Sequence, residues 1–213
     1  MVQRVAGIAI PDSAMARAAT ELVCHCESEI FFHHSLRVFL FAALLGNRRN
    51  LAFDSELLYI CALFHDVGLT SGYGNSKRRF EVDSANAARN FLEKYDIEEC
   101  DAAEVWEAIA LHMSFGIAEH MTPLISLLAA GIEADLFAKH RKKFSTSELD
   151  EVLMFYPRED RFEEAIIDAM AQGMAHRPAS TFGTIQADIL ERVDPNYRRT
   201  NFCGLVLGSR WRS

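Results

Sequence analysis

An apolar run that ends in two ionisable residues constrains this chain more than any other feature. Leu57–Phe64 is apolar without interruption, and His65 and Asp66 follow it directly. A helix with no polar face is buried on all sides, and Gly68 marks its C-terminal end. Two adjacent ionisable side chains in that setting carry a large desolvation penalty, which a divalent metal can offset. We therefore expect the chemistry of the protein at these two residues.

The composition is that of a soluble globular protein. The chain has 213 residues, of which 50% are hydrophobic and 24% are charged, and its formal net charge is −8. A negatively charged chain is unsuited to coating nucleic acid or an anionic membrane. Basic clusters at Arg48–Arg49 and Lys77–Arg79 could still hold an anionic group. We expect a small-molecule substrate, and no nucleic acid or membrane, as the partner.

The cysteines and the N-terminal residues indicate the compartment. The five cysteines are odd in number and include no Cys-x-x-Cys pair, which is typical of free thiols in a reducing cytosol. The N-terminal residues contain no long apolar segment of the kind found in secretory signals. The longest uncharged apolar stretches, Val38–Gly46 and Met121–Ile132, are too short to span a bilayer. We expect a cytoplasmic protein.

Helical signals run through almost the whole chain. Pro11 to Ser13 form a helix start, Asp54 and Ser55 another, and Ser145 to Glu148 a capping box. Alternation of β-branched residues is missing, so we predict an all-α fold. The predicted helices cover about 13–29, 30–47, 55–66, 83–95, 101–113, 123–140, 145–157, 159–175 and 184–193.

No low-complexity linker or internal repeat divides the chain, so we expect one domain over residues 1–213. Its core spans about 13–140, and a helical appendage spans about 141–213. The glycine-rich segment 67–80 forms a loop close to the ionisable pair. The tail after Pro195 is predicted to be irregular, with the apolar segment Phe202–Leu207 packed back on the body.

Three of the predicted helices place polar side chains beside apolar runs. The three sets are His33–Arg37 before Val38–Leu45, His65–Asp66 after Leu57–Phe64, and Glu133–Asp135 after Leu124–Ile132. A single histidine or aspartate of this kind is more often a hydrogen-bonded structural residue or a solvent-exposed one. Four ligands converging in a helical bundle would instead bind one first-row metal and leave positions open for water. The coincidence of three such sets favours the metal.

These residues resemble the H…HD…D signature of the HD-domain superfamily of metal-dependent hydrolases. His34, the pair His65–Asp66 and Asp135 supply the signature, separated by 31 and 69 residues. The resemblance implies an all-α HD-domain helical bundle with a central metal held by His34, His65, Asp66 and Asp135. The metal is a divalent ion whose identity stays open among Zn, Fe, Mn, Co and Ni.

A less specific likeness points to the cyanamide hydratase-like branch of that superfamily. It consists of the segments Arg79–Asp83, Ala110–Ser114, Gly116–Ala118 and Asn201–Cys203. The resemblance implies an enzyme, a metal-dependent hydrolase or hydratase, in which a metal-activated water attacks a small molecule. A bound metal lowers the pKa of its water from ~15.7 to ~7. Hydration of cyanamide to urea is the implied example.

Three residues are candidates for catalytic roles beside the metal. Asp66 could accept the proton of the attacking water. His112, at an apolar helix end, could contact substrate or relay a proton; it could also complete the metal shell or be a core histidine bonded to a carbonyl. Arg37 shares a helical face with His34 and could orient an anionic substrate or form a structural ion pair.

Two other functions remain open. A phosphohydrolase acting on a nucleotide or another phosphate ester would need cations near the metal, and Arg37 and Lys77–Arg79 are the candidates. Nucleotidase-like members often carry a carboxylate one turn beyond the HD pair, where this chain has Leu69. The third functional hypothesis is a non-catalytic binding module that the metal stabilises. The apolar tail could form the interface of a homo-oligomer.

Overall fold

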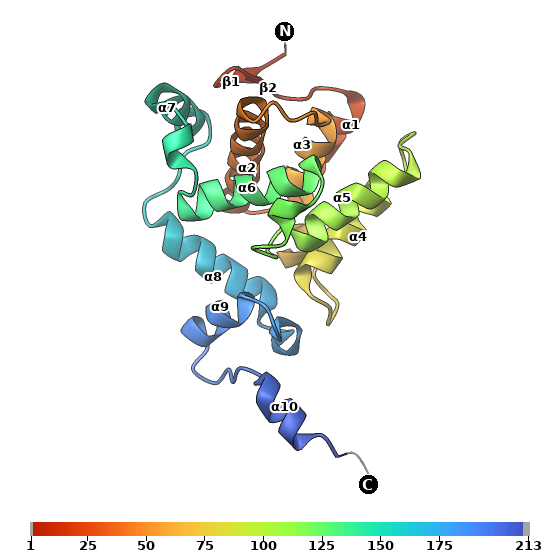
Figure 1. The fold of residues 1–213 in the computed structure, drawn as a ribbon, viewed down its shortest axis with the longest axis vertical. Helices are drawn as coiled ribbons and strands as arrows, with labels where there is room; N and C mark the ends of the chain where they lie inside the picture. The colour runs from red at the N-terminus through yellow and green to blue at the C-terminus, as the bar shows by residue number, and fades with distance from the viewer. Residues whose placement is uncertain (1, 211–213) are drawn as a thin grey trace.

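Two long apolar helices form the centre of the fold. The computed structural model describes residues 2–210, and within them α2 (Glu29–Arg48) and α6 (Pro123–Phe137) make the most extensive helix–helix contact. Gly131 permits this contact, because a Cβ at that position would collide with the carbonyl oxygen of Val38 on α2. Figure 1 shows the two helices crossing at the middle of the molecule.

Helix α3 (Ser55–Phe64) confirms the prediction of a helix buried on all sides. Asp54 caps it, since its carboxylate accepts hydrogen bonds from the backbone N–H groups of Glu56 and Leu57 at 2.8 and 2.9 Å. Every residue from Leu57 to Phe64 is buried. The helix ends at Phe64, two residues before the predicted boundary, and a 3₁₀ turn (Val67–Leu69) begins after His65 and Asp66. The ionisable pair therefore lies at a helix end inside the core.

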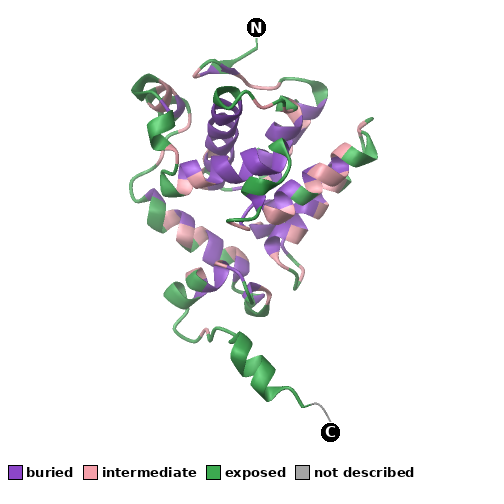
Figure 2. Cartoon of the chain, in the orientation of Figure 1, coloured by how far each residue is buried: buried purple, intermediate pink, exposed green. Residues whose placement is uncertain are grey.

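Three further helices enclose α3. Helix α1 (Ala14–Cys26) packs on α3, and α4 (Phe80–Leu92) and α5 (Glu99–Leu111) pack on each other and on α3. Helix α4 starts three residues before the predicted boundary because Phe80 is buried at its first position. Figure 2 shows α2, α3 and α6 as the most continuously buried part of the chain.

The C-terminal part adds helices on one side of this core. Helix α7 (Thr146–Phe155) begins at the predicted capping box of Ser145 and Glu148. Helix α8 (Phe162–Met174) contacts α2, the 3₁₀ turn after the ionisable pair, and α9 (Gln186–Val193). Helix α8, part of the predicted appendage, thus packs against the core.

The tail differs from the expectation. Residues Phe202–Gly208 form a short helix, α10, and do not pack back on the body. Phe202 is 67% exposed and Leu207 is 86% exposed. Asn201 stabilises the helix locally by accepting a hydrogen bond from the backbone N–H of Gly204. Figure 1 shows α10 beyond an extended segment, away from the other helices. Apolar composition indicated a buried surface but could not specify what covers it.

Two very short strands are the other departure from a purely helical chain. β1 (Arg4–Val5) and β2 (Ile8–Ala9) form an antiparallel hairpin. Ala6 and Gly7 make the turn with φ of 49° and 78°. Strands of two residues are too short to produce an alternating pattern in the sequence, so the predicted all-α class holds for the core.

Helix α2 is long and apolar enough to cross a membrane when judged by length and composition alone. However, 78% of the 18-residue apolar window in this helix is buried inside the molecule, and the helix contains the fully buried Arg37. We interpret α2 as the core helix of the fold.

Candidate metal centre

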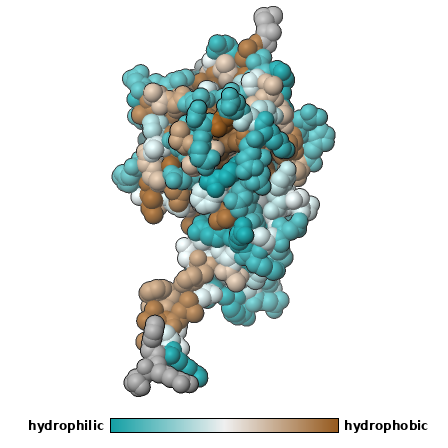
Figure 3. Space-filling view, turned by 90° about the vertical axis from the view of Figure 1, so that its right-hand side faces the viewer, coloured by the Kyte–Doolittle hydropathy of each residue, from teal (hydrophilic) through white to brown (hydrophobic). Residues whose placement is uncertain are grey.

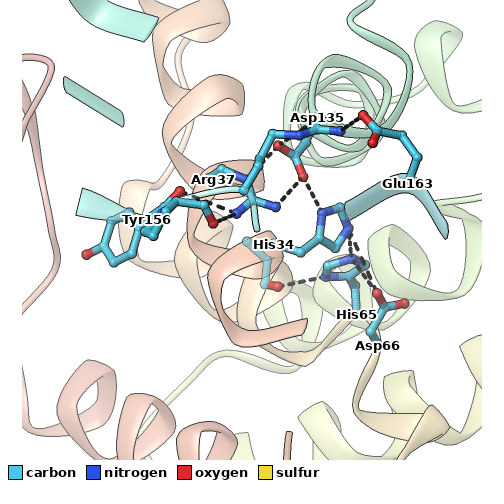
Figure 4. A network of polar contacts seen from close by, with 10 residues as sticks. His34, Arg37, His65, Asp66, Asp135, Tyr156 and Glu163 are labelled. Carbon is cyan, nitrogen blue, oxygen red and sulfur yellow. Dashed lines mark hydrogen bonds and ion pairs between the residues drawn. The ribbon is translucent and has the colours of Figure 1, made fainter. Parts of the chain in front are cut away.

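Three predicted ligands meet in the core. His34 comes from the first half of α2, and His65 and Asp66 directly follow the last residue of α3; all three are buried. Their ligand atoms lie within 4.8 Å of one another. The Nε2 atoms of His34 and His65 are 3.3 Å apart, and Asp66 Oδ2 lies 3.9 Å from the first and 3.2 Å from the second. Figure 4 shows the three side chains pointing toward one another.

The size of this triangle fits a first-row divalent metal. A triangle with these three sides has a circumscribed circle of radius about 2.0 Å, so one point lies at that distance from all three atoms. Metal–ligand bonds of zinc to imidazole and carboxylate are about 2.0–2.2 Å. The three side chains could therefore hold a divalent ion without rearrangement.

The hydrogen bonds of the two histidines direct their Nε2 lone pairs at this point. His34 Nδ1 lies 2.6 Å from Asp135 Oδ2, and His65 Nδ1 lies 2.7 Å from the carbonyl oxygen of Ala62. Both partners are acceptors, so each Nδ1 carries the proton, and this assignment follows from the bonding pattern. Two lone pairs facing each other at 3.3 Å require a positive charge between them, either a proton or a metal ion.

The pKa shifts of His65 and Asp66 agree with a site for a cation. Burial raises the pKa of Asp66, but the neighbouring His65, His34 and His112 together hold it well below its ordinary value. Burial lowers the pKa of His65, but the Asp66 carboxylate outweighs this effect and the net change is upward. In the absence of a metal, a proton on His65 can thus occupy the position of the cation.

Asp135 is not brought into the ligand group. It lies on α6 behind His34, where its carboxylate accepts from His34 Nδ1 and from Arg37 Nε and Nη2 at 2.7 and 3.0 Å. Burial raises the pKa of Asp135, whereas the hydrogen bonds from His34 and Arg37 lower it, and the net result is well below the ordinary value. Asp135 thus has the position of a carboxylate that fixes the orientation of the His34 ring.

Arg37 is fully buried, and its guanidinium group donates hydrogen bonds to acceptors inside the protein. Besides Asp135, it donates to the carbonyl oxygens of Tyr156 and Pro157 at 3.3 and 2.9 Å. Its guanidinium also lies 4.7 Å from the ring centre of Phe162. Of its two expected roles, substrate contact and structural ion pair, the geometry matches the second.

His112 stands at the edge of the ligand group. Its Nε2 is 3.9 Å from Asp66 Oδ1, and its ring meets the rings of His65 and Phe80 edge to face at 5.1 and 5.6 Å. Its Nδ1 lies 2.6 Å from the carbonyl oxygen of Ile109, so Nε2 is the free acceptor. Burial, and then the charge of His65, lower the pKa of His112 to about 4. The neutral ring faces the site.

The acidic residues that follow the 67–80 loop have other partners. Asp83 accepts a hydrogen bond from the buried Arg177 at 2.6 Å. Glu81 pairs with Arg79 and accepts from Gln186 at 2.9 Å. The contacts with Arg177 and Gln186 hold the start of α4 against the C-terminal segment.

One acidic residue near the site was missed in the sequence. Glu27, at the end of α1, is buried, and neither of its carboxylate oxygens has a hydrogen-bond partner within residues 2–210; the same holds for Ser35 Oγ. Burial, together with the nearby charge of Asp66, raises the pKa of Glu27 well above its ordinary value. Its neighbours Cys26 and Ser28 form no apolar run, so no pattern indicated a buried carboxyl there.

Apolar side chains make up about half of the lining of the site. The pocket around the ligand group is enclosed, and its lining consists of four polar residues and five apolar ones: His34, His65, Asp66, His112, Met113, Ile132, Leu136, Ile166 and Met170. Ile166 and Met170 come from α8, which was assigned to the appendage. Among these lining residues there is no lysine or arginine.

Comparison with known proteins agrees with this geometry. The family model described as the HD domain matches residues 31–170, a range that contains His34, His65, Asp66 and Asp135. Members of this family are generally metal-dependent hydrolases. No curated protein matches the chain.

Proposed function

We propose, from the premise that this chain belongs to the HD-domain family, that it is a metal-dependent hydrolase or hydratase of small, uncharged molecules. His34, His65 and Asp66 would hold one divalent ion. When bound, such an ion polarises an electrophile and supplies hydroxide near neutral pH. Cyanamide-type hydration is one reaction of this class.

One observation carries the choice of an uncharged substrate: within residues 2–210, no cationic side chain lines the pocket around the ligand group. Phosphate esters need cations that offset their negative charge in the site. The candidates expected from the sequence are engaged or distant. Arg37 is paired with Asp135, Arg79 is paired with Glu81, and Lys77 donates to the carbonyl oxygen of His176. Leu69, in place of a carboxylate, agrees with this preference.

The chain's own residues supply proton handling beside the ion. Asp66 presents Oδ2 to the histidines, while its Oδ1 faces His112 Nε2 at 3.9 Å. The unprotonated Nε2 of the neutral His112 ring could therefore accept a proton from a group held at the ion. The apolar walls exclude bulk water and strengthen these interactions.

The test is a paired measurement of metal content and substrate range. The purified chain, loaded with zinc or manganese, is incubated with cyanamide, simple nitriles and small amides, and separately with nucleoside mono- and diphosphates. The proposal predicts turnover of a member of the first group, lost on chelation and in Asp66→Ala. Faster turnover of the phosphate esters would contradict the proposal and support the hypothesis of a phosphohydrolase. Retained metal with no turnover of either group would support the binding module.

A further inference from the structure

A second cavity adjoins the metal pocket and is not used by the proposed chemistry. It is an open groove of about 560 Å³ between the ends of α5 and α6 and the faces of α8 and α9. This volume falls within the usual range of small-molecule sites, about 300–1,000 Å³. Aromatic and aliphatic side chains form most of its surface, with Phe115, Phe137, Ile167 and Ile189 among them.

The groove and the metal pocket share a wall. Met113, Leu136, Ile166 and Met170 line both cavities. A single layer of side chains therefore separates the groove from His65 and its neighbours. Methionine is the most adaptable apolar side chain, and two of the four shared residues are methionines. A ligand in the groove could reach the metal pocket through movement of this layer alone.

The charges around the groove are already neutralised. In the part of the chain that the structure describes, its ionisable lining residues are Glu163 and Asp188, which stand at the exposed rim. Glu163 pairs with Arg158 at 2.9 Å, and Asp188 pairs with Arg199 at 2.8 Å. An anionic ligand would lose its hydration in the groove and gain no cation in return.

Exposure of large apolar side chains in a hollow indicates a binding surface. Phe137 is 56% exposed and meets the ring of Phe115 at 5.5 Å, centre to centre. Exposure of this ring to water does not stabilise the fold, whereas a ligand that covers the ring is stabilised by the burial of apolar area.

We propose that this groove binds the alkyl or aryl part of an uncharged substrate, whose reactive group extends past Ile166 and Met170 to the metal centre. The inference rests on the proposed function and adds the substrate class: small neutral molecules that carry an apolar substituent. Two other occupants have weaker support. Helix α10 exposes apolar residues (Figure 3), but neither it nor a second copy of the chain shares the continuity with the metal pocket.

Binding of a neutral fluorescent probe, N-phenyl-1-naphthylamine, tests the groove without any need for turnover. We expect the full chain to bind the probe, and Phe137→Ser and Ile189→Asn to weaken binding roughly five- to ten-fold, because each removes apolar contact area. Phe202→Ser on α10 is the matched control, since Phe202 is 67% exposed and outside the groove. Equal weakening in Phe202→Ser would overturn the proposal, as would binding that falls when the protein concentration rises.

Displacement of the same probe tests the substrate class. Hexanenitrile should displace it at a concentration at least roughly ten-fold below that of acetonitrile or hexyl phosphate, because only hexanenitrile is both apolar and uncharged. Equal displacement by hexyl phosphate would overturn the proposal. These measurements work on chelated protein, so a groove that binds as expected in a chain without turnover would refute the proposed function separately.

Discussion

His34 and His65 face each other through their Nε2 atoms at 3.3 Å, while the Nδ1 of each ring is bonded outward to an acceptor. Neither nitrogen can donate to the other in this arrangement unless one ring is fully protonated. The carboxylate of Asp66 adds a third acceptor to the same point. An arrangement of three acceptors around a buried point is stable only when a positive charge lies among them.

Metal binding should therefore stabilise the folded chain, and Asp66→Ala should abolish that effect. A ligand that binds only the folded state at 100 times its Kd adds about 2.7 kcal/mol to the free energy of unfolding. Thermal unfolding with and without added zinc measures it. Wild type should gain a higher Tm, and Asp66→Ala should gain none while keeping its helix content. An equal gain in the variant would show that the metal binds elsewhere.

His112→Ala should retain the metal and lose turnover. His112 packs edge to face on His65 and brings its Nε2 to 3.9 Å from Asp66 Oδ1, but it is not one of the three grouped ligands, so its removal leaves those three in place. Loss of one general acid–base group typically lowers the rate about 10²–10⁴-fold. Metal content and kcat measured together decide the role. Loss of the metal in this variant would place His112 among the ligands.

Arg37→Ala should destabilise the fold strongly. Removing one partner of a buried ion pair costs about 3–5 kcal/mol, because the carboxylate of Asp135 stays buried and loses the guanidinium that pairs with it at 2.7 Å. Arg48→Ala is the matched control, since Arg48 pairs with Glu148 at a partly exposed site and the expected cost is about 1 kcal/mol or less. Urea denaturation of both variants measures the difference. Equal losses would argue against the structural role of Arg37.

Glu27→Gln should change how the stability of the metal-free chain depends on pH. The folded pKa of Glu27 is raised above 4.5, so the folded state holds a proton that the unfolded state releases as the pH rises above that value. Stability is full below about pH 4.5 and falls above it, by up to about 1.4 kcal/mol per pH unit, until the folded pKa is reached. Glutamine has no proton to lose.

The variant should therefore become more stable than wild type as the pH rises above about 4.5. Denaturation midpoints across this range measure the difference, with Glu21→Gln, an exposed position on the same helix, as the control. Parallel pH curves for wild type and Glu27→Gln would contradict a buried, protonated Glu27.

Much of the fold followed from local signals in the sequence. The apolar run before His65 predicted a helix buried on all sides, because no solvent-facing side chain could stabilise an exposed one. The capping box at Ser145 predicted the start of α7, because its two hydrogen bonds depend only on residues three apart. The spacing of His34, His65 and Asp66 identified the family and three side chains that meet.

What the sequence left open depends on contacts between distant residues. Nothing near Asp135 indicates that Arg37, 98 residues away, pairs with its carboxylate and holds it behind His34. The burial of Glu27 likewise results from packing and not from its neighbours. The covering of the site by Met170 required the position of α8, which helical periodicity alone cannot place.

The most direct test of the metal centre is elemental analysis of three purified chains after loading with one divalent metal and removal of the excess. Wild type and His33→Ala should each retain one ion per chain, because His33 lies beside a ligand in the sequence but pairs with Glu29 instead. His65→Ala should retain none. Full occupancy in His65→Ala, or equal loss in His33→Ala, would contradict a cation held by His34, His65 and Asp66.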